Sequence, residues 1–200
     1  MTEVTKVAII GTGGIAHNHA AAYQRVPGVE IAAVADIVPG KAAAFAKEFG
    51  VPLAFEDYHD LLNMPEIVAL SVCTYNMAHR QPAVDALMAG KDVLLEKPMA
   101  ARLDDAIAII QAANKSGKIL QTGFWPRWQE HNKTAKQIVQ SGALGEVYYA
   151  QMVGGGRRRI PGGTFMKKET AGFGPLVDIG CYDLDAFMFL MDSPIPTRTL

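Results

Sequence analysis

The chain has 200 residues, half of them hydrophobic, which is enough for one medium core or two small ones. Its 19 basic and 20 acidic residues leave a net charge of −1, so no overall field favours nucleic acid or a membrane surface. Cys73 and Cys181 form neither a CxxC motif nor a disulfide framework, as is typical of a reducing compartment. The sequence carries no signal-peptide pattern and no apolar run of about 18 to 20 residues. We therefore expect a cytoplasmic protein.

Residues 5–122 alternate between short apolar segments and helical patterns. The expected strands, near-continuous runs of Val, Ile, Leu and Ala, cover 6–10, 30–35, 67–73, 92–95 and 119–122. The expected helices cover 16–25, 40–49, 79–89 and 103–116, and a glycine follows each of them. This alternation predicts an α/β fold, a doubly wound parallel sheet of the Rossmann type, as a first domain over residues 1–122.

The sequence changes character after Thr122, where we place the start of a second domain, 123–200. It predicts a helix at 129–141, a strand at Val147–Val153 and a long apolar helix at 175–191. One strand cannot form a sheet alone, so this domain is expected to be only the beginning of a larger one. The run Arg157-Arg158-Arg159 between these elements is interpreted as a solvated loop, with a clamp for an anionic group as the alternative.

A glycine-rich motif, Gly11-Thr12-Gly13-Gly14-Ile15-Ala16, follows the first strand and opens the first helix. Gly11 permits a tight turn, and Gly13 lets the backbone approach a pyrophosphate. Gly14 and Ile15 begin the helix, whose N-terminus attracts an anion. We therefore assign Gly11, Gly13, Gly14 and Ile15 to a dinucleotide-binding loop.

Asp36 ends the second strand about 20 residues after this motif, where a carboxylate can accept both ribose hydroxyls. Ile37 follows it instead of arginine, so NAD is favoured over NADP, and Lys41 is the one nearby basic residue that argues otherwise. A methyltransferase also places an acid after its second strand. It usually carries another before the glycines, where this chain has Ile9 and Ile10.

The fourth expected strand ends in Glu96, Lys97 and Pro98, within DVLLEKPMA at 92–100. Ligands of an open parallel sheet bind at the carboxyl ends of its strands, so Lys97 is placed at the reaction edge. Pro98 restricts Lys97 to extended geometry, and a cis bond is possible there. The alternative is an ordinary surface lysine.

The expected helix 175–191 carries one polar stripe, Asp178, Tyr182 and Asp185, at positions i, i+4 and i+7. Gly180 in its interior suggests that another group approaches closely. The stripe fits either a hydrogen-bonded core network or a catalytic site. His17 and His19, two residues apart on a helix, face different directions and do not predict a metal site.

Several motifs together resemble the glucose–fructose oxidoreductase / inositol dehydrogenase / rhizopine-catabolism (Gfo/Idh/MocA) family over essentially the whole chain. They are GTGGIAHNHA, VADIVPGKAAAFAKEFGV, SVCTYNMAH, AGKDVLLEKPMA, SGALGEV and GFGPLVDIGCYDLD. The resemblance implies that Lys97 contacts cofactor and substrate, and that Asp178 and Tyr182 occupy the catalytic D-x-x-x-H/Y positions. Tyrosine stands there in place of the commoner histidine.

The same resemblance places Thr74, Asn76 and Glu96 near the cofactor; Glu96 either touches the ribose or pairs with a neighbouring base. In the GFWPRW segment, Arg127 matches the family, while Trp125 replaces a polar residue and should reshape the substrate side of the pocket.

The resemblance further implies hydride transfer between NAD and a secondary alcohol or ketone of a sugar, cyclitol or derivative. It also implies an α+β second domain with an open, mainly antiparallel sheet, truncated here, and a homo-oligomer in the full-length form. We expect no nucleic-acid or membrane partner, and we expect the 200 residues to bind cofactor but turn over poorly. The alternative is a redox-sensing or inactive dinucleotide-binding protein without turnover.

Overall fold

The computed structural model of the chain describes residues 4–152 and 162–198. The chain forms two compact units. The first comprises residues 1–123 together with 163–172, and the second comprises 124–162 and 173–200. The segment 163–172, which the sequence analysis assigned to the second domain, thus packs with the first unit.

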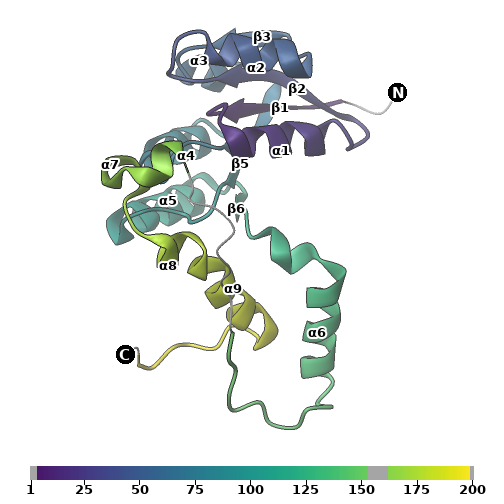
Figure 1. The fold of residues 1–200 in the computed structure, drawn as a ribbon. Helices are drawn as coiled ribbons and strands as arrows, with labels where there is room; N and C mark the ends of the chain where they lie inside the picture. The colour runs from purple at the N-terminus through teal and green to yellow at the C-terminus, as the bar shows by residue number, and fades with distance from the viewer. Residues whose placement is uncertain (1–3, 153–161, 199–200) are drawn as a thin grey trace. The chain divides into compact units, whose positions relative to one another are not determined.

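A six-stranded parallel sheet forms the centre of the first unit (Figure 1). Its strands are β1 (Thr5–Ile10), β2 (Val29–Ala35), β3 (Leu53–Phe55), β4 (Ile67–Val72), β5 (Asp92–Leu95) and β6 (Leu120–Thr122). Their order, β3-β2-β1-β4-β5-β6, reverses direction at β1, which confirms the doubly wound Rossmann arrangement. The sequence analysis missed β3, an edge strand of three residues that is too short to show a pattern.

Helices cover both faces of the sheet (Figure 1). One face packs on α1 (Gly14–Tyr23) and α2 (Lys41–Phe49), with Ile9 of β1 in that core. The other face packs on α3 (His59–Leu62), α4 (Arg80–Met88) and α5 (Leu103–Ser116), and Ile10 of β1 lies in that core. Neighbouring residues of one strand therefore enter opposite cores, which explains why the strands read as continuous apolar runs.

Backbone hydrogen bonds between neighbouring strands continue past the strand ends at the carboxyl edge of the sheet. The Gly11 N–H donates to the Ala35 carbonyl at 2.7 Å, and the Cys73 N–H donates to the Ile10 carbonyl at 2.7 Å. The Glu96 N–H likewise donates to the carbonyl of Val72 at 3.0 Å. The loops after β1, β4 and β5 therefore begin from a common, hydrogen-bonded edge.

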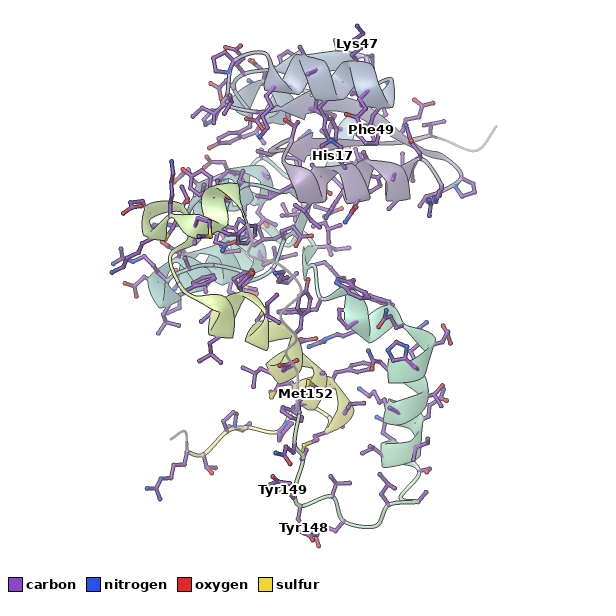
Figure 2. All side chains as sticks on the ribbon, viewed as in Figure 1. His17, Lys47, Phe49, Tyr148, Tyr149 and Met152 are labelled. Carbon is purple, nitrogen blue, oxygen red and sulfur yellow. The ribbon has the colours of Figure 1, made fainter. Side chains whose placement is uncertain are left out.

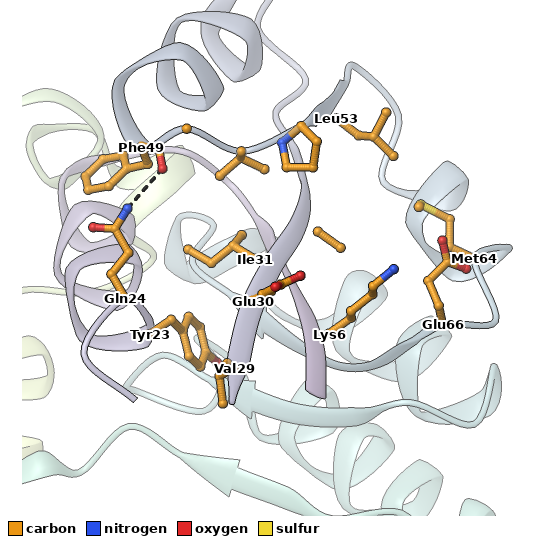
Figure 3. Close-up of a pocket in the computed structure, with 14 residues that line it drawn as sticks. Lys6, Tyr23, Gln24, Val29, Glu30, Ile31, Phe49, Leu53, Met64 and Glu66 are labelled. Carbon is orange, nitrogen blue, oxygen red and sulfur yellow. Dashed lines mark hydrogen bonds between the residues drawn. The ribbon is translucent and has the colours of Figure 1, made fainter. Parts of the chain in front are cut away.

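A cavity of about 430 Å³ lies at the opposite, amino edge of the sheet (Figure 3). Lys6, Glu30 and Glu66 line it from the starts of three strands, and Gln24 donates to the Phe49 carbonyl at 2.9 Å along its rim. Ligands of open parallel sheets bind at the carboxyl edge, so this cavity is not the expected active site.

The second unit contains η2 (Trp125–Trp128), α6 (Glu130–Gln140), α8 (Pro175–Asp178) and α9 (Gly180–Leu190). Both α6 and η2 pack on α9. Arg127 of η2 donates to both carboxylate oxygens of Asp185 on α9. Its Nε contacts Oδ2 at 2.8 Å and Oδ1 at 3.1 Å, and its Nη2 contacts Oδ1. Asp185 is buried, and this hydrogen-bonded pair raises the pKa of Arg127 further above its usual range.

Two expectations for this unit are wrong. Residues 147–152 form no strand, because no described strand lies beside them to complete their backbone hydrogen bonds. Tyr148 and Tyr149 project from this stretch, and Tyr148 is 91% exposed (Figure 2). Val153 and the run Arg157-Arg158-Arg159 lie outside the described residues.

The expected helix 175–191 is also not continuous, because α8 ends at Asp178 and α9 begins at Gly180. Glycine destabilises a helix interior relative to alanine. The break places Gly180 at the start of a helix, where that destabilisation is smaller. A Cβ at Gly180 would contact only Leu176 Cδ1, at an ordinary 3.4 Å. Asp178 and Tyr182 therefore do not share one helical stripe.

None of the helices in the described ranges has the length and apolar character that a membrane crossing requires. In the same ranges, no three His, Cys, Asp or Glu side chains gather closely enough to hold a metal ion.

The end of β1 generates a stability prediction. Gly11 has φ +85°, and a Cβ there would lie 2.8 Å from the Cys73 carbonyl oxygen. We expect Gly11→Ala to lower the free energy of unfolding by about 2 kcal/mol or more. Gly13→Ala is the matched control, because Gly13 has φ −78° and open space around its Cβ position. Equal losses in the two variants, measured by urea denaturation, would contradict this account.

Candidate active site

A cavity of about 820 Å³ lies at the carboxyl edge of the sheet, within the first unit. Its walls come from the loops after β1, β2, β3 and β4 and from the segment 163–172. The sequence-predicted residues among those that line it are Gly11, Gly13, Gly14, Ile15, Asp36, Thr74 and Asn76. These seven residues lie up to 65 positions apart in the chain but line one space, because parallel strands end at a common edge.

The glycine loop leaves room for an anionic group. No side chain caps α1, and Gly13 occupies its N-cap position. A Cβ added at Gly13 or at Gly14 would meet nothing within 4 Å, so the space beside the helix N-terminus is open. An open helix N-terminus with aligned peptide dipoles suits a phosphate. The residues present therefore fit the pyrophosphate of a dinucleotide.

Asp36 is held firmly at the end of β2. Its Oδ2 accepts from the backbone N–H and the hydroxyl of Thr12, both at 2.8 Å, and its Oδ1 accepts from the Val38 N–H at 3.0 Å. Lys41 Nζ lies 3.1 Å from Oδ2. Burial alone raises the pKa of Asp36, but these donors outweigh it and hold the pKa below its ordinary value. Asp36 is therefore an ionised carboxylate facing the cavity.

The sequence analysis missed the wall of the cavity that the segment 163–172 forms. Thr164, Phe165, Thr170 and Ala171 line it from η3 (Gly163–Met166) and α7 (Lys168–Ala171). The Asn76 side-chain amide donates to the Ala171 carbonyl at 3.2 Å and ties this segment to the loop after β4. No periodic pattern marks residues 163–171.

Gly172 closes the same segment with φ +81°. A Cβ there would lie 2.7 Å from Ala101 Cβ and 2.8 Å from Met77 Sδ. The glycine itself was the one signal that the sequence offered, because any larger residue at this place would collide with these two side chains.

Glu96 pairs with a neighbouring base. Its Oε1 lies 2.8 Å from His19 Nε2, and its Oε2 accepts from the Lys97 N–H at 3.1 Å. His19 Nδ1 lies 3.0 Å from Ser71 Oγ, which is 2.7 Å from the Tyr23 hydroxyl. Since a carboxylate only accepts, His19 Nε2–H donates to Glu96. A partly buried chain of four side chains, from Tyr23 to Glu96, thus supports the backbone of Lys97.

His79 supports the next residue of the same turn. Its Nδ1 lies 2.9 Å from the Pro98 carbonyl oxygen and its Nε2 lies 3.2 Å from the Thr74 carbonyl oxygen. The side chain is fully buried, and this burial lowers its pKa. The Lys97–Pro98 bond is cis. The turn after β5 is thus linked to the turn after β4.

The remaining predicted catalytic residues lie in the second unit. Asp178 is the last residue of α8, and Tyr182 lies in the first turn of α9. The Tyr182 ring makes edge contacts with Phe124 and Trp125, at centroid distances of 6.2 and 6.3 Å. Trp125, the residue expected to reshape the pocket, therefore packs beside Tyr182.

The fold and this cavity define a dinucleotide-binding protein of the Rossmann class. A sequence profile described as "Oxidoreductase family, NAD-binding Rossmann fold" matches residues 5–124, and the Gfo/Idh/MocA C-terminal domain profile matches residues 132–198. The chain belongs to the Gfo/Idh/MocA oxidoreductase family, as its motifs indicated.

Named relatives agree with this assignment. D-glucoside 3-dehydrogenase of Escherichia coli is 35% identical over 191 residues, covering 94% of this chain and 54% of that protein. Inositol 2-dehydrogenase of Salmonella typhimurium is 37% identical over 144 residues, covering 70% of this chain and 43% of that protein. The crystal structure of an NAD-binding protein from Listeria innocua matches with a TM-score of 0.81 at 28% identity, covering 95% of this chain and 54% of that one. The chain spans about half the length of these relatives.

The buried pair at the Lys97 turn generates a stability prediction. We expect His19→Ala to lower the free energy of unfolding by about 3 kcal/mol, because it leaves the Glu96 carboxylate buried without its partner. His17→Ala, on the same helix, is the control. His17 pairs with Glu48 at 3.5 Å, and 41% of its side chain is exposed. Chemical denaturation measures the free energy of unfolding of both variants. A decrease in His17→Ala as large as that in His19→Ala would refute this account.

Asp36 generates a prediction about pH. Its folded-state pKa lies below the unfolded value, so its contribution to stability is present above about pH 4 and is lost as the pH falls through the folded pKa. In Asp36→Asn, the free energy of unfolding should fall less steeply with acid than in the original chain. Urea denaturation at a series of pH values from about 6 to 2.5 measures both slopes. Identical slopes would contradict the assignment.

Proposed function

We propose that this protein is an NAD-dependent dehydrogenase that acts on a secondary alcohol or ketone of a sugar, cyclitol or derivative. The observation that carries the proposal is the cavity at the carboxyl edge, which combines an open glycine loop with an ionised, buried Asp36. Family membership supports the reaction type. The names of the relatives, a glucoside and an inositol dehydrogenase, support the substrate class.

We assign cofactor binding to residues of the first unit. Gly11, Gly13, Gly14 and Ile15 would surround the pyrophosphate at the start of α1. Asp36 would accept the ribose hydroxyls, which favours NAD because a 2′-phosphate would meet its negative charge. The cavity residues Thr74 and Asn76, and Glu96 and Lys97 after β5, complete the proposed set. Glu96 then acts through its bonds to His19 and to the Lys97 N–H.

The proposed chemistry uses Lys97, Asp178 and Tyr182. Bound NAD supplies an acceptor for the hydride that leaves the substrate carbon. The hydroxyl proton leaves at the same time, with Tyr182 and Lys97 as the two candidate acceptors. Where Tyr182 accepts the proton, Lys97 as an ammonium would stabilise negative charge on the reacting oxygen; where Lys97 accepts it, Lys97 would have to enter the step as the neutral amine. In either case Asp178 would orient substrate and lysine. The alcohol is thereby oxidised to a ketone, and the reverse sequence reduces it.

We further propose that the longer form is a cytoplasmic homo-oligomer whose partners are small molecules and not nucleic acid or membrane. The near-zero net charge supports the absence of a nucleic-acid or membrane partner, and the cysteine usage supports a reducing compartment. The homo-oligomer rests on the family resemblance alone.

Calorimetric titration with NAD and NADP tests the proposal. We expect NAD to bind more tightly than NADP, and Asp36→Ala to lose most of that preference together with affinity for NAD. Formation of NADH by the longer form of the protein, with a panel of sugars and cyclitols, then tests the reaction. Binding of NAD without oxidation of any of them would favour the redox-sensing alternative, and binding of neither nucleotide would overturn the proposal.

A further inference from the structure

The cavity at the amino edge of the sheet exists because β3 is shorter than its neighbour β2 (Figure 3). β2 begins at Val29, but β3 pairs with it only from Ala33 onward, starting with Leu53. Residues 29–32 of β2 line the cavity, and no strand in the described part of the chain pairs with them on the β3 side. The cavity therefore occupies the place that a longer β3 would fill, and a ligand can reach the outer edge of β2.

The chain that precedes β3 cannot extend the sheet into this space. The Val51 N–H donates to the Ala46 carbonyl at 2.9 Å, so it is already used to end α2. Pro52 has no N–H to donate to a neighbouring strand. Residues 49–53 form an apolar wall of the cavity instead, and Leu53 in this wall is 41% exposed.

Three charged side chains border the same space. Lys6 of β1 lies opposite Glu30 of β2 in the strand register, and Glu66 directly precedes β4. Within the described residues, none of these three side chains forms an ion pair. The cavity therefore combines an apolar wall with charged groups of both signs that have no ionic partner there.

Lys91 determines the balance of these charges. Its buried ammonium donates to the carbonyls of Met64 and Ile67, which flank Glu66 in the chain, both at 2.7 Å. Burial lowers the pKa of Lys91, and the attraction of Glu66 opposes that shift. Because Glu66 acts as a counter-charge to Lys91, one cation on β1 and one anion on β2 are left for a ligand.

We propose that this cavity binds a small zwitterion with an apolar body, the chemistry of an apolar α-amino acid. The carboxylate of the ligand pairs with Lys6, its ammonium pairs with Glu30, and its side chain packs on the wall formed by residues 49–53. An apolar amine would leave Lys6 without a partner, and an apolar acid would leave Glu30 without one. The cavity volume, about 430 Å³, lies within the range of about 300–1,000 Å³ that is usual for small-molecule sites.

This site is separate from the cofactor cavity. The two cavities lie at opposite edges of the sheet and share no lining residue. The proposal therefore goes beyond the dehydrogenase function and does not depend on it. We expect the zwitterion and NAD to bind at the same time.

The first experiment compares three ligands of similar size by ligand-observed NMR titration of the 200-residue chain. They are L-phenylalanine, phenethylamine, which lacks the carboxylate, and 3-phenylpropanoate, which lacks the ammonium. We expect L-phenylalanine to bind with a dissociation constant of about 0.1–1 mM. Each of the other two should bind about three- to tenfold more weakly, because it loses one charged contact. Equal affinities for all three, or no binding of L-phenylalanine at about 10 mM, would overturn the proposal.

The second experiment repeats these titrations with Lys6→Gln and Glu30→Gln. Lys47→Gln and Glu48→Gln are the matched controls, because both residues are exposed near the end of α2 and neither lines the cavity (Figure 2 labels Lys47). Lys6→Gln should weaken binding of L-phenylalanine about three- to tenfold and leave that of phenethylamine unchanged. Glu30→Gln should weaken L-phenylalanine equally and leave 3-phenylpropanoate unchanged.

This crossed pattern distinguishes a lost contact from a damaged fold, which would weaken all three ligands together. Equal weakening of all three in Lys6→Gln and Glu30→Gln, or a comparable effect in either control, would overturn the assigned contacts. A saturating concentration of NAD should leave the dissociation constant of L-phenylalanine unchanged. Displacement of L-phenylalanine by NAD would overturn its placement at the amino edge.

Discussion

The close approach of the chain at the end of β1 is the constraint on which the candidate site depends. The backbone of Gly11 is hydrogen-bonded to Ala35 and packed against the Cys73 carbonyl, which leaves no space for a side chain. The glycine loop, Asp36 and Thr74 follow directly from these three strand ends. One point of backbone contact therefore fixes the relative positions of three loops, and the cavity results from that contact before any ligand is present.

The sequence predicted the interior of the first unit well, because strands buried on both faces consist of continuous apolar residues with glycine at the helix ends. It predicted the secondary structure less well where contacts with distant parts of the chain determine it. The edge strand β3 has three residues and no pattern, and the stretch 147–152 has strand-like residues but no neighbouring strand. At Gly180 the apolar pattern continued through a residue that favours a break.

The same distinction applies to the residues of the candidate site. Gly11, Gly13 and Asp36 were predictable because a local motif specifies their geometry. The partner of Glu96 was not, since His19 is 77 positions away and its pairing depends on how α1 lies against the sheet. Lys41 was noticed only as a nearby charge, and its contact with Asp36 required the structure. Residues that support or tune a site through long-range contacts carry no local signal.

The wall of the cavity that the segment 163–172 forms has a consequence for synthesis of the chain. The last strand of the sheet ends at Thr122, but the segment that completes the cavity ends at Gly172, after a stretch that belongs to the other unit. At about 5–20 residues per second, those further residues take several seconds to emerge from the ribosome. The nascent sheet therefore exposes its glycine loop and Asp36 to the cell before the wall arrives, and a free nucleotide can reach an unfinished site during that interval.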